Sequence, residues 1–261
     1  MKIVRFLHDG QERYGIVEGA TAYVCEGDPF GGLKRTPEAL DAGSLKLLSP
    51  VSPPNIFCLG LNYRSHADEG GESYPPAPLI FLKPTTALCG PGDAIVLPEG
   101  YEESIDYEVE LVIVIGKRAK NVPQESVDDF ILGYTIGNDV SNRTAQFKDG
   151  QWARGKSHDT FCPIGPAIVK GINGDDLDIS CRIDGKVMQS SNTSNMIFSC
   201  RHIVSYISRS MTLLPGTIIL TGTPEGVGFV RKPPVFLKEG QVVECTIGGI
   251  GTLSNPVVRS R

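Results

Sequence analysis

One strand-like run constrains the fold of this chain most: residues 106–115, which read Asp-Tyr-Glu-Val-Glu-Leu-Val-Ile-Val-Ile. Its β-branched residues and the glycine that follows predict a β-strand, and after Leu111 the run is apolar on both faces, as in a buried strand. Because side chains alternate along a strand, Glu108 and Glu110 project from one face, about 6–7 Å apart. Their repulsion is about 2.5 kcal/mol at an effective dielectric near 20. A shared cation would remove this cost; the alternative is a half-exposed strand end with two solvated glutamates.

The length and composition exclude several classes of protein. A chain of 261 residues with 40% hydrophobic and 21% charged residues is typical of a soluble globular protein. The net charge of -5, with no basic run, gives no electrostatic reason to expect a nucleic acid or a membrane surface as partner. No run approaches the length of a transmembrane helix, and residues 1–7 are too short and polar for a signal peptide. The seven cysteines are odd in number and widely spaced, which favours reduced thiols and a cytoplasmic location.

The first 52 residues are predicted to form a small N-terminal domain. Residues 1–24 alternate in strand fashion and predict a meander. Residues 36–42 suggest a short helix that begins at Pro37, and residues 47–55 hold three prolines and resemble a linker. A piece of about 50 residues hardly carries its own core, so we expect it to pack against residues 53–261.

Strands outnumber helices in the remainder of the chain. Residues 177–189 predict a β-hairpin around Asp184-Gly185, and residues 196–211 predict the one long amphipathic helix. Most connections are too short for parallel crossovers. The chain is therefore predicted to have a mixed, β-rich α+β architecture with largely antiparallel strands.

A third carboxylate, Asp139, follows the predicted strand at 133–137. The pattern from Asp139 onward is helical and places Arg143 and Gln146 on the same side, at i+4 and i+7. Three carboxylates without histidine or cysteine suit Mg²⁺, with Mn²⁺ or Ca²⁺ as alternatives, and argue against Zn²⁺. Open positions on such an ion would let a 2-oxo acid bind through its keto and carboxylate oxygens.

Three further segments carry candidate catalytic residues. His66 and Glu69 lie three residues apart, so on a helical turn Glu69 can orient the imidazole. A single histidine in a polar loop is usually a surface residue, and the same holds for Lys156. The glycine-rich loop at 222–228 matches neither a dinucleotide fingerprint nor a P-loop, but its backbone amides can approach a substrate carboxylate.

Five motifs in this order and spacing resemble the fumarylacetoacetate hydrolase family. They lie at residues 62–69, 106–111, 137–146, 155–161 and 221–228. The resemblance runs from about residue 55 to the C-terminus and implies a β-roll fold, usually in a homodimer. It also implies a divalent metal, usually Mg²⁺, bound by three carboxylates: Glu108, Glu110 and Asp139.

The resemblance further implies roles for residues around the metal. A flap would carry a water-activating dyad, an electrophilic pair would stabilise the enolate or oxyanion, and two polar residues would lie near the substrate. These pairs are His66 with Glu69, Lys156 with Thr223, and Arg143 with Gln146. The reactions of the family are cleavage of C–C bonds next to a carbonyl, decarboxylation of oxaloacetate, and isomerisation of hydroxymuconate-type diacids.

One departure from the family narrows the prediction. Fumarylacetoacetases proper carry an additional metal-binding aspartate shortly before the dyad histidine, whereas residues 57–61 hold no acid. This favours the shorter bacterial-type, acylpyruvase-like branch. We therefore predict a Mg²⁺-dependent hydrolase that cleaves a C–C bond in a 2,4-dioxo acid, with oxaloacetate decarboxylation as an accompanying activity. The alternative is a 2-hydroxyhepta-2,4-diene-1,7-dioate isomerase or decarboxylase.

Two rival classes follow from the same residues. A non-catalytic metal-binding β-protein needs the three acids but gives no reason for His66, Lys156 and Thr223. A Schiff-base aldolase would use Lys156 as its nucleophile.

Overall fold

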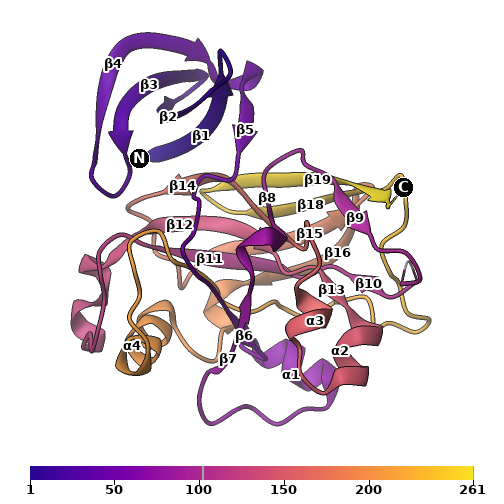
Figure 1. Ribbon diagram of the computed structural model, residues 1–261. Coiled ribbons are helices and arrows are strands. Elements are labelled where there is room, and N and C mark those ends of the chain that lie inside the picture. The colour runs from indigo at the N-terminus through magenta and orange to yellow at the C-terminus, as the bar shows by residue number, and fades with distance from the viewer. Residues whose placement is uncertain (102, 261) are drawn as a thin grey trace.

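The computed structural model describes residues 1–101 and 103–260 and confirms the β-rich α+β prediction (Figure 1). The largest sheet has twelve strands in the order β4-β3-β2-β1-β14-β12-β11-β17-β6-β7, with β5 paired to β1 and β8 to β14. Its members are β1 Lys2–His8, β2 Gln11–Glu18, β3 Thr21–Asp28, β4 Gly32–Asp41, β5 Lys46–Leu48, β6 Ile56–Gly60, β7 Leu79–Lys83, β8 Leu88–Cys89, β11 Val109–Ile115, β12 Ile131–Asn138, β14 Cys162–Val169 and β17 Ile218–Leu220.

Two smaller sheets complete the β-structure. The five-stranded sheet has the order β16-β15-β18-β19-β9, and the two-stranded sheet pairs β10 with β13. Their bounds are β9 Ile95–Leu97, β10 Ile105–Asp106, β13 Ser141–Asn142, β15 Asp178–Ile183, β16 Lys186–Asn192, β18 Val242–Ile247 and β19 Gly251–Arg259. Strands β15 and β16 form the predicted hairpin, which is confirmed.

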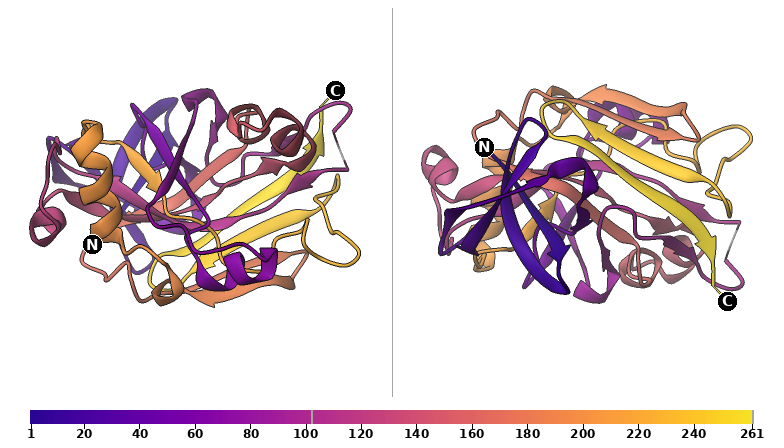
Figure 2. Two further views of the ribbon diagram at one scale, coloured as in Figure 1. Left: turned by 90° about the horizontal axis from the view of Figure 1, so that it is seen from below. Right: turned by 90° about the horizontal axis from the view of Figure 1, so that it is seen from above.

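The N-terminal strands β1–β5 form a curled lobe that continues the large sheet. Strand β1 pairs antiparallel with β14, with Lys2 opposite Val169 and Ile3 opposite Ile168. Figure 2 shows this lobe in front when the molecule is seen from above and the helices in front when it is seen from below. The N-terminal segment therefore packs against the remainder of the chain, as expected, because β1 pairs with β14 on one side and with β2 on the other.

The helix predicted at residues 36–42 is wrong, because residues 36–41 belong to strand β4 and Ala42 begins a 3₁₀ turn. The pairing of β3 with β4 shifts register between Tyr23, which faces Ala39, and Cys25, which faces Arg35. This irregularity accommodates Pro37, which has no N–H to donate to a ladder. A partner strand supplied by the tertiary fold overrides the local signal for a helix start.

Strand β11 is buried on both faces, as its sequence predicts. Leu111 and Ile113 face one core, shared with the five-stranded sheet and with helix α4. Val112 and Val114 face a second core, which includes residues of β6, β14 and β17. The strand predicted at residues 106–115 is interrupted at residues 107–108, so Glu110 lies in β11 and Glu108 directly precedes it, at the end of a strand that is buried in the centre of the molecule.

The helices are short, and two differ from their predicted bounds. They are α1 Arg64–Gly70, α2 Arg143–Asp149, α3 Ala153–Lys156 and α4 Cys200–Ser210, with 3₁₀ turns at Ala42–Ser44, Thr85–Ala87, Gln124–Asp129 and Thr193–Asn195. Helix α4 begins later than predicted because the side chain of Ser199 accepts the His202 N–H and caps it. Within the described residues, no helix is long and apolar enough to cross a membrane.

Helix α2 begins at Arg143, so the helical face predicted to include Asp139 is wrong. The Asn142 side chain accepts the Ala145 N–H at 3.0 Å and caps the helix. Asp139 instead directly follows strand β12. Its position is therefore fixed by sheet pairing and not by helical periodicity.

Candidate active site

The three predicted carboxylates meet at one buried point. Strands β11 and β12 pair antiparallel, with Val109 opposite Asn138 and Glu110 opposite Gly137. This register brings Glu108, Glu110 and Asp139 together, and their carboxylate oxygens lie within 4.8 Å of one another. All three side chains are buried. Such a cluster is stable only with compensating positive charge or bound protons.

Lys156 and Lys83 supply part of this charge. The Lys156 ammonium donates to Glu108 Oε2 at 2.5 Å and to Asp139 Oδ2 at 2.7 Å. Lys83, from β7, donates to the other Asp139 oxygen at 2.5 Å and to the Val140 carbonyl at 3.3 Å. Burial alone would lower the pKa of Lys156, but the two carboxylates outweigh it and raise that pKa. Lys156 is therefore protonated, which disfavours the Schiff-base rival, since an amine attacks only as its neutral form.

Arg143 compensates Glu108 from the other side. Its guanidinium donates to Glu108 Oε1 at 2.6 Å, to Asp106 Oδ2 at 2.9 Å and to Gln146 Oε1 at 3.0 Å. Burial would raise the pKa of Glu108, but Lys156 and Arg143 hold it below its usual range. Arg143 and Gln146 line the cavity as predicted, but the described contacts of Arg143 are with protein acids, so its geometry is that of a positioning residue.

Asp106 was missed as a site residue, although the sequence contains a signal for it. It lies two residues before Glu108, so it shares the face of the strand that the acids occupy. Its carboxylate accepts the Gly228 N–H at 2.7 Å and the Phe229 N–H at 3.1 Å, as well as Arg143. Asp106 thus anchors the end of the glycine-rich loop to the acidic cluster.

Glu110 differs from Glu108 because no ammonium or guanidinium pairs with it among the described residues. The Gly222 N–H donates to Glu110 Oε2 at 2.6 Å. Gly222 has a φ of +96°, and a Cβ there would lie 2.7 Å from Asn62 Cβ, so only glycine fits. Burial and repulsion from Asp139 and Glu108 raise the pKa of Glu110 well above its usual value. The donor set and this uncompensated charge fit a hard divalent cation such as Mg²⁺.

His66 and Glu69 both lie on α1, but they do not form a closed hydrogen bond. Their closest atoms, Nδ1 and Oε2, are 3.9 Å apart. Glu69 Oε2 instead accepts the Gly226 N–H at 2.9 Å, and Nδ1 of His66 is buried without a hydrogen-bond partner among the described residues. Burial opposes the charge on Glu69, but His66 and the Gly226 N–H lower the pKa of Glu69. His66 lines the cavity, whereas Glu69 does not belong to its lining.

Thr223 lies at the cavity floor with its hydroxyl already committed. It donates to the Val109 carbonyl at 2.9 Å and accepts the Gln189 side-chain amide at 2.8 Å. A hydroxyl has one proton to donate. In this arrangement the Thr223 proton is therefore not available to an oxyanion.

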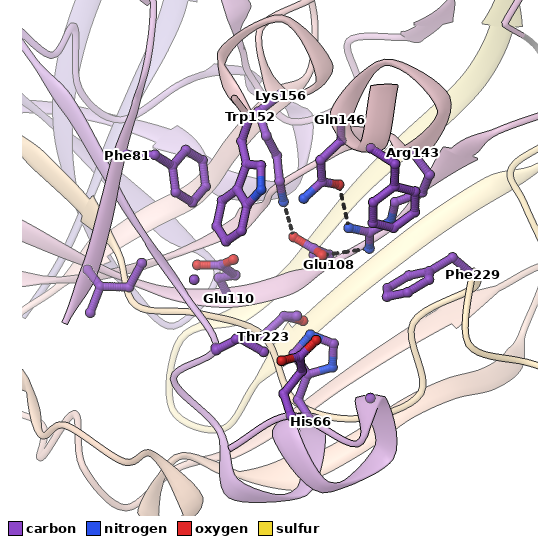
Figure 3. A pocket seen from close by; sticks show the side chains of 16 residues that line it. His66, Phe81, Glu108, Glu110, Arg143, Gln146, Trp152, Lys156, Thr223 and Phe229 are labelled. Atoms are coloured by element: carbon purple, nitrogen blue, oxygen red, sulfur yellow. Dashed lines mark hydrogen bonds and ion pairs between the residues drawn. The ribbon is translucent and has the colours of Figure 1, made fainter. Parts of the chain in front are cut away.

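The cavity above the cluster has a volume of about 190 Å³ (Figure 3). His66 points into it from one side, while Trp152 and Lys156 point into it from the other, with Glu108 and Glu110 between. Its other walls are largely aromatic and aliphatic, and include Phe81, Phe147, Trp152 and Phe229. The site thus combines a buried acidic cluster, one imidazole and one ammonium in a small enclosure.

Nothing in the sequence identifies Lys83 as a residue of the site, because a lysine that ends a strand before a proline is typical of a surface position. Replacing it with methionine should lower the free energy of unfolding of the metal-free protein by about 3 kcal/mol, since Asp139 loses a buried partner. Mg²⁺ should restore much of the loss. Urea unfolding with and without Mg²⁺ measures both effects.

The exposed Lys117 is the matched control, and Lys117→Met should change stability by less than about 0.5 kcal/mol. A Lys83→Met loss that is equal to the control, or that Mg²⁺ does not reduce, would contradict this assignment.

The fold and the site define a β-rich protein with a buried cluster of three carboxylates, which could hold a metal ion, beneath a small cavity. Residues 55–258 match the family model described as fumarylacetoacetate (FAA) hydrolase C-terminal, and residues 1–50 match one described as Rv2993c-like, N-terminal. The chain therefore belongs to the fumarylacetoacetate hydrolase family, as its motifs predict.

Several individual relatives and solved structures are similar to this chain over most of its length. Oxaloacetate tautomerase fahd2, mitochondrial, of Xenopus laevis is 46% identical over 225 residues, which cover 84% of this chain and 70% of the relative. An uncharacterized protein of Methanocaldococcus jannaschii is 51% identical over 210 residues, covering 80% and 85%. The crystal structure of 2-hydroxyhepta-2,4-diene-1,7-dioate isomerase from Mycobacterium marinum is 43% identical with a TM-score of 0.90, covering 100% of this chain and 99% of that one.

Proposed function

We propose that this protein is a metal-dependent enzyme that moves protons within a short 2-oxo acid, as a tautomerase or isomerase. The observation that carries this proposal is the state of the dyad: Glu69 bonds to Gly226, and His66 stands 3.9 Å from it, facing the cavity. A single imidazole is sufficient to remove and return a proton next to a carbonyl. The names of the relatives from Xenopus laevis and Mycobacterium marinum support the same class of reaction.

Four groups of residues would share the work. Glu108, Glu110 and Asp139 would hold the divalent cation, which supplies Lewis-acid stabilisation of an enolate oxygen when bound. Lys156 would place its ammonium beside the same developing charge. His66 would take the proton from the carbon next to the carbonyl and return it at the new position, and Arg143 with Asp106 would hold Glu108 in place.

Hydrolysis of a C–C bond is the second candidate. It needs an activated water, and the separation between His66 and Glu69 is within ion-pair range. Catalytic hydrogen bonds often tighten only when substrate binds, so closure of the dyad would create a stronger base. The sequence places hydrolysis first and isomerisation second, and the present proposal reverses that order.

A panel of acids in Mg²⁺ tests the proposal. We expect faster keto–enol interconversion of oxaloacetate or isomerisation of a hydroxymuconate-type diacid, followed by ultraviolet absorbance. Cleavage of acylpyruvates without any keto–enol activity would overturn the proposal in favour of hydrolysis. Trapping of the protein by borohydride with a 2-oxo acid would instead support the Schiff-base rival.

A further inference from the structure

Trp152 separates the cavity from a second hollow in the surface. The second hollow has a volume of about 530 Å³ and is lined by residues 79–82 of β7 and residues 150–153 before and within α3. Trp152 and Phe81 belong to the walls of both spaces. Their rings contact edge to face, with centroids 5.3 Å apart and an interplanar angle of 77°. These two rings are therefore a partition between the two spaces.

The indole of Trp152 is held against a glycine. A Cβ on Gly60 would lie 2.4 Å and 2.6 Å from two ring carbons of Trp152, so the indole packs directly on the backbone of β6. Any side chain at position 60 would push the ring out of place. The absence of a Cβ at Gly60 thus leaves the space that the indole fills in this position.

The indole of Trp152 lies one helical turn before Lys156, whose ammonium binds the acidic cluster. The backbone N–H of Lys156 donates to the backbone carbonyl of Trp152 at 3.0 Å, and both side chains point to the same side (Figure 3). A substrate whose carbonyl lies beside Lys156 meets the indole as its tail extends in this direction. The remaining 190 Å³ is smaller than the usual volume of sites for drug-sized ligands.

We propose that Trp152, held by Gly60, limits the length of the substrate's tail and makes the site specific for compact 2-oxo acids. This inference rests on the proposed function, because it assumes that a 2-oxo acid binds beside Lys156. Without the indole, the cavity would open into the hollow beside Leu79 and Leu82, whose apolar side chains would accept a longer aliphatic tail.

Calorimetric binding of two acids in Mg²⁺ tests the limit. The probes are 2,4-dioxopentanoate and 2,4-dioxononanoate, which differ by four methylenes in the tail. The wild type should bind the short acid at least about tenfold more tightly. Trp152→Ala should shift the ratio of the two affinities by about tenfold or more toward the long acid.

Gly60→Ala is a second, independent variant because it displaces the indole without removing it. It should shift the ratio in the same direction, and it should change the fluorescence of Trp152, the single tryptophan of the chain. Leu82→Ala is the matched control. Leu82 lines the second hollow but not the cavity, and it is 50% exposed, so its truncation should leave the ratio of the two affinities unchanged.

The outcomes separate this inference from the proposed function. If the wild type binds the short acid but neither Trp152→Ala nor Gly60→Ala shifts the ratio, the length limit is overturned and the function stands. An equal shift in Leu82→Ala also overturns it. If the wild type binds neither acid and shows no keto–enol activity, the proposed function and the limit fail together.

Discussion

Removal of divalent ions with EDTA should abolish the activity of this protein on 2-oxo acids, and Mg²⁺ or Mn²⁺ should restore it. Lys156 and Arg143 already neutralise Glu108, but Glu110 has no cationic partner among the described residues. The cluster therefore keeps a charge that only a cation or a proton compensates. Full activity in a sample verified to be metal-free would contradict the proposed metal dependence.

Glu110→Gln is the sharpest variant for this prediction. Glutamine keeps an acceptor for the Gly222 N–H but removes the charge, so the affinity for Mg²⁺ should fall at least about 100-fold. The metal-free variant should stay folded, because repulsion with Asp139 and Glu108 is relieved. Calorimetry measures the affinity, and Glu239→Gln at an exposed surface pair is the control.

The pH dependence of stability gives a second readout. Because the pKa of Glu110 is raised in the fold, its protonated form is favoured there. Its stabilising contribution is full below the pKa of the unfolded chain and is lost as the pH rises through the raised folded pKa. In EDTA, the Tm of the wild type should therefore fall with pH more steeply than that of Glu110→Gln. Equal slopes would show that Glu110 does not carry the uncompensated charge.

His66→Ala should reduce keto–enol interconversion of oxaloacetate by on the order of 10²-fold or more, because the cavity loses its general base. Decarboxylation of the same acid needs a stabilised enolate but no base, so it should fall less. The ratio of the two rates, measured on one substrate by one absorbance assay, isolates proton transfer from binding. A parallel fall in both rates would mean that His66 acts in binding or folding.

Two variants refine this result. Glu69→Gln keeps an acceptor for the Gly226 N–H, so it should leave keto–enol interconversion nearly unchanged while it weakens any C–C hydrolysis. His8→Ala is the matched control, because His8 lies on β1 in the N-terminal lobe. A large loss of keto–enol activity in Glu69→Gln would favour a closed dyad and the hydrolytic alternative.

Local patterns in the sequence are sufficient to predict the centre of the fold. The period of two along residues 106–115 places Glu108 and Glu110 on one face and the apolar residues in two cores, as observed. The hairpin around Asp184-Gly185 is also local, since turn chemistry fixes it. The spacing of His66 and Glu69 correctly predicts that both lie on one helix.

Contacts between distant segments decided the rest of the site. Asp139 reaches the cluster through the register of β12 on β11, and not through the helical spacing that its sequence suggests. Residues 36–41 belong to a strand because β3 pairs with them, despite a proline that resembles a helix start. Pairing partners are chosen by the whole fold, so no periodicity within a segment encodes them.

By itself, the sequence determined the family, the three acids that form the buried cluster and the helix that carries His66. Only the tertiary structure decided that Lys83 compensates Asp139 and that Arg143 holds Glu108 and Asp106. These charges lie close together because strands and helices far apart in the chain meet at one end of β11. Burial there makes each charge depend on its partners, a property of the packed structure that single residues do not reveal.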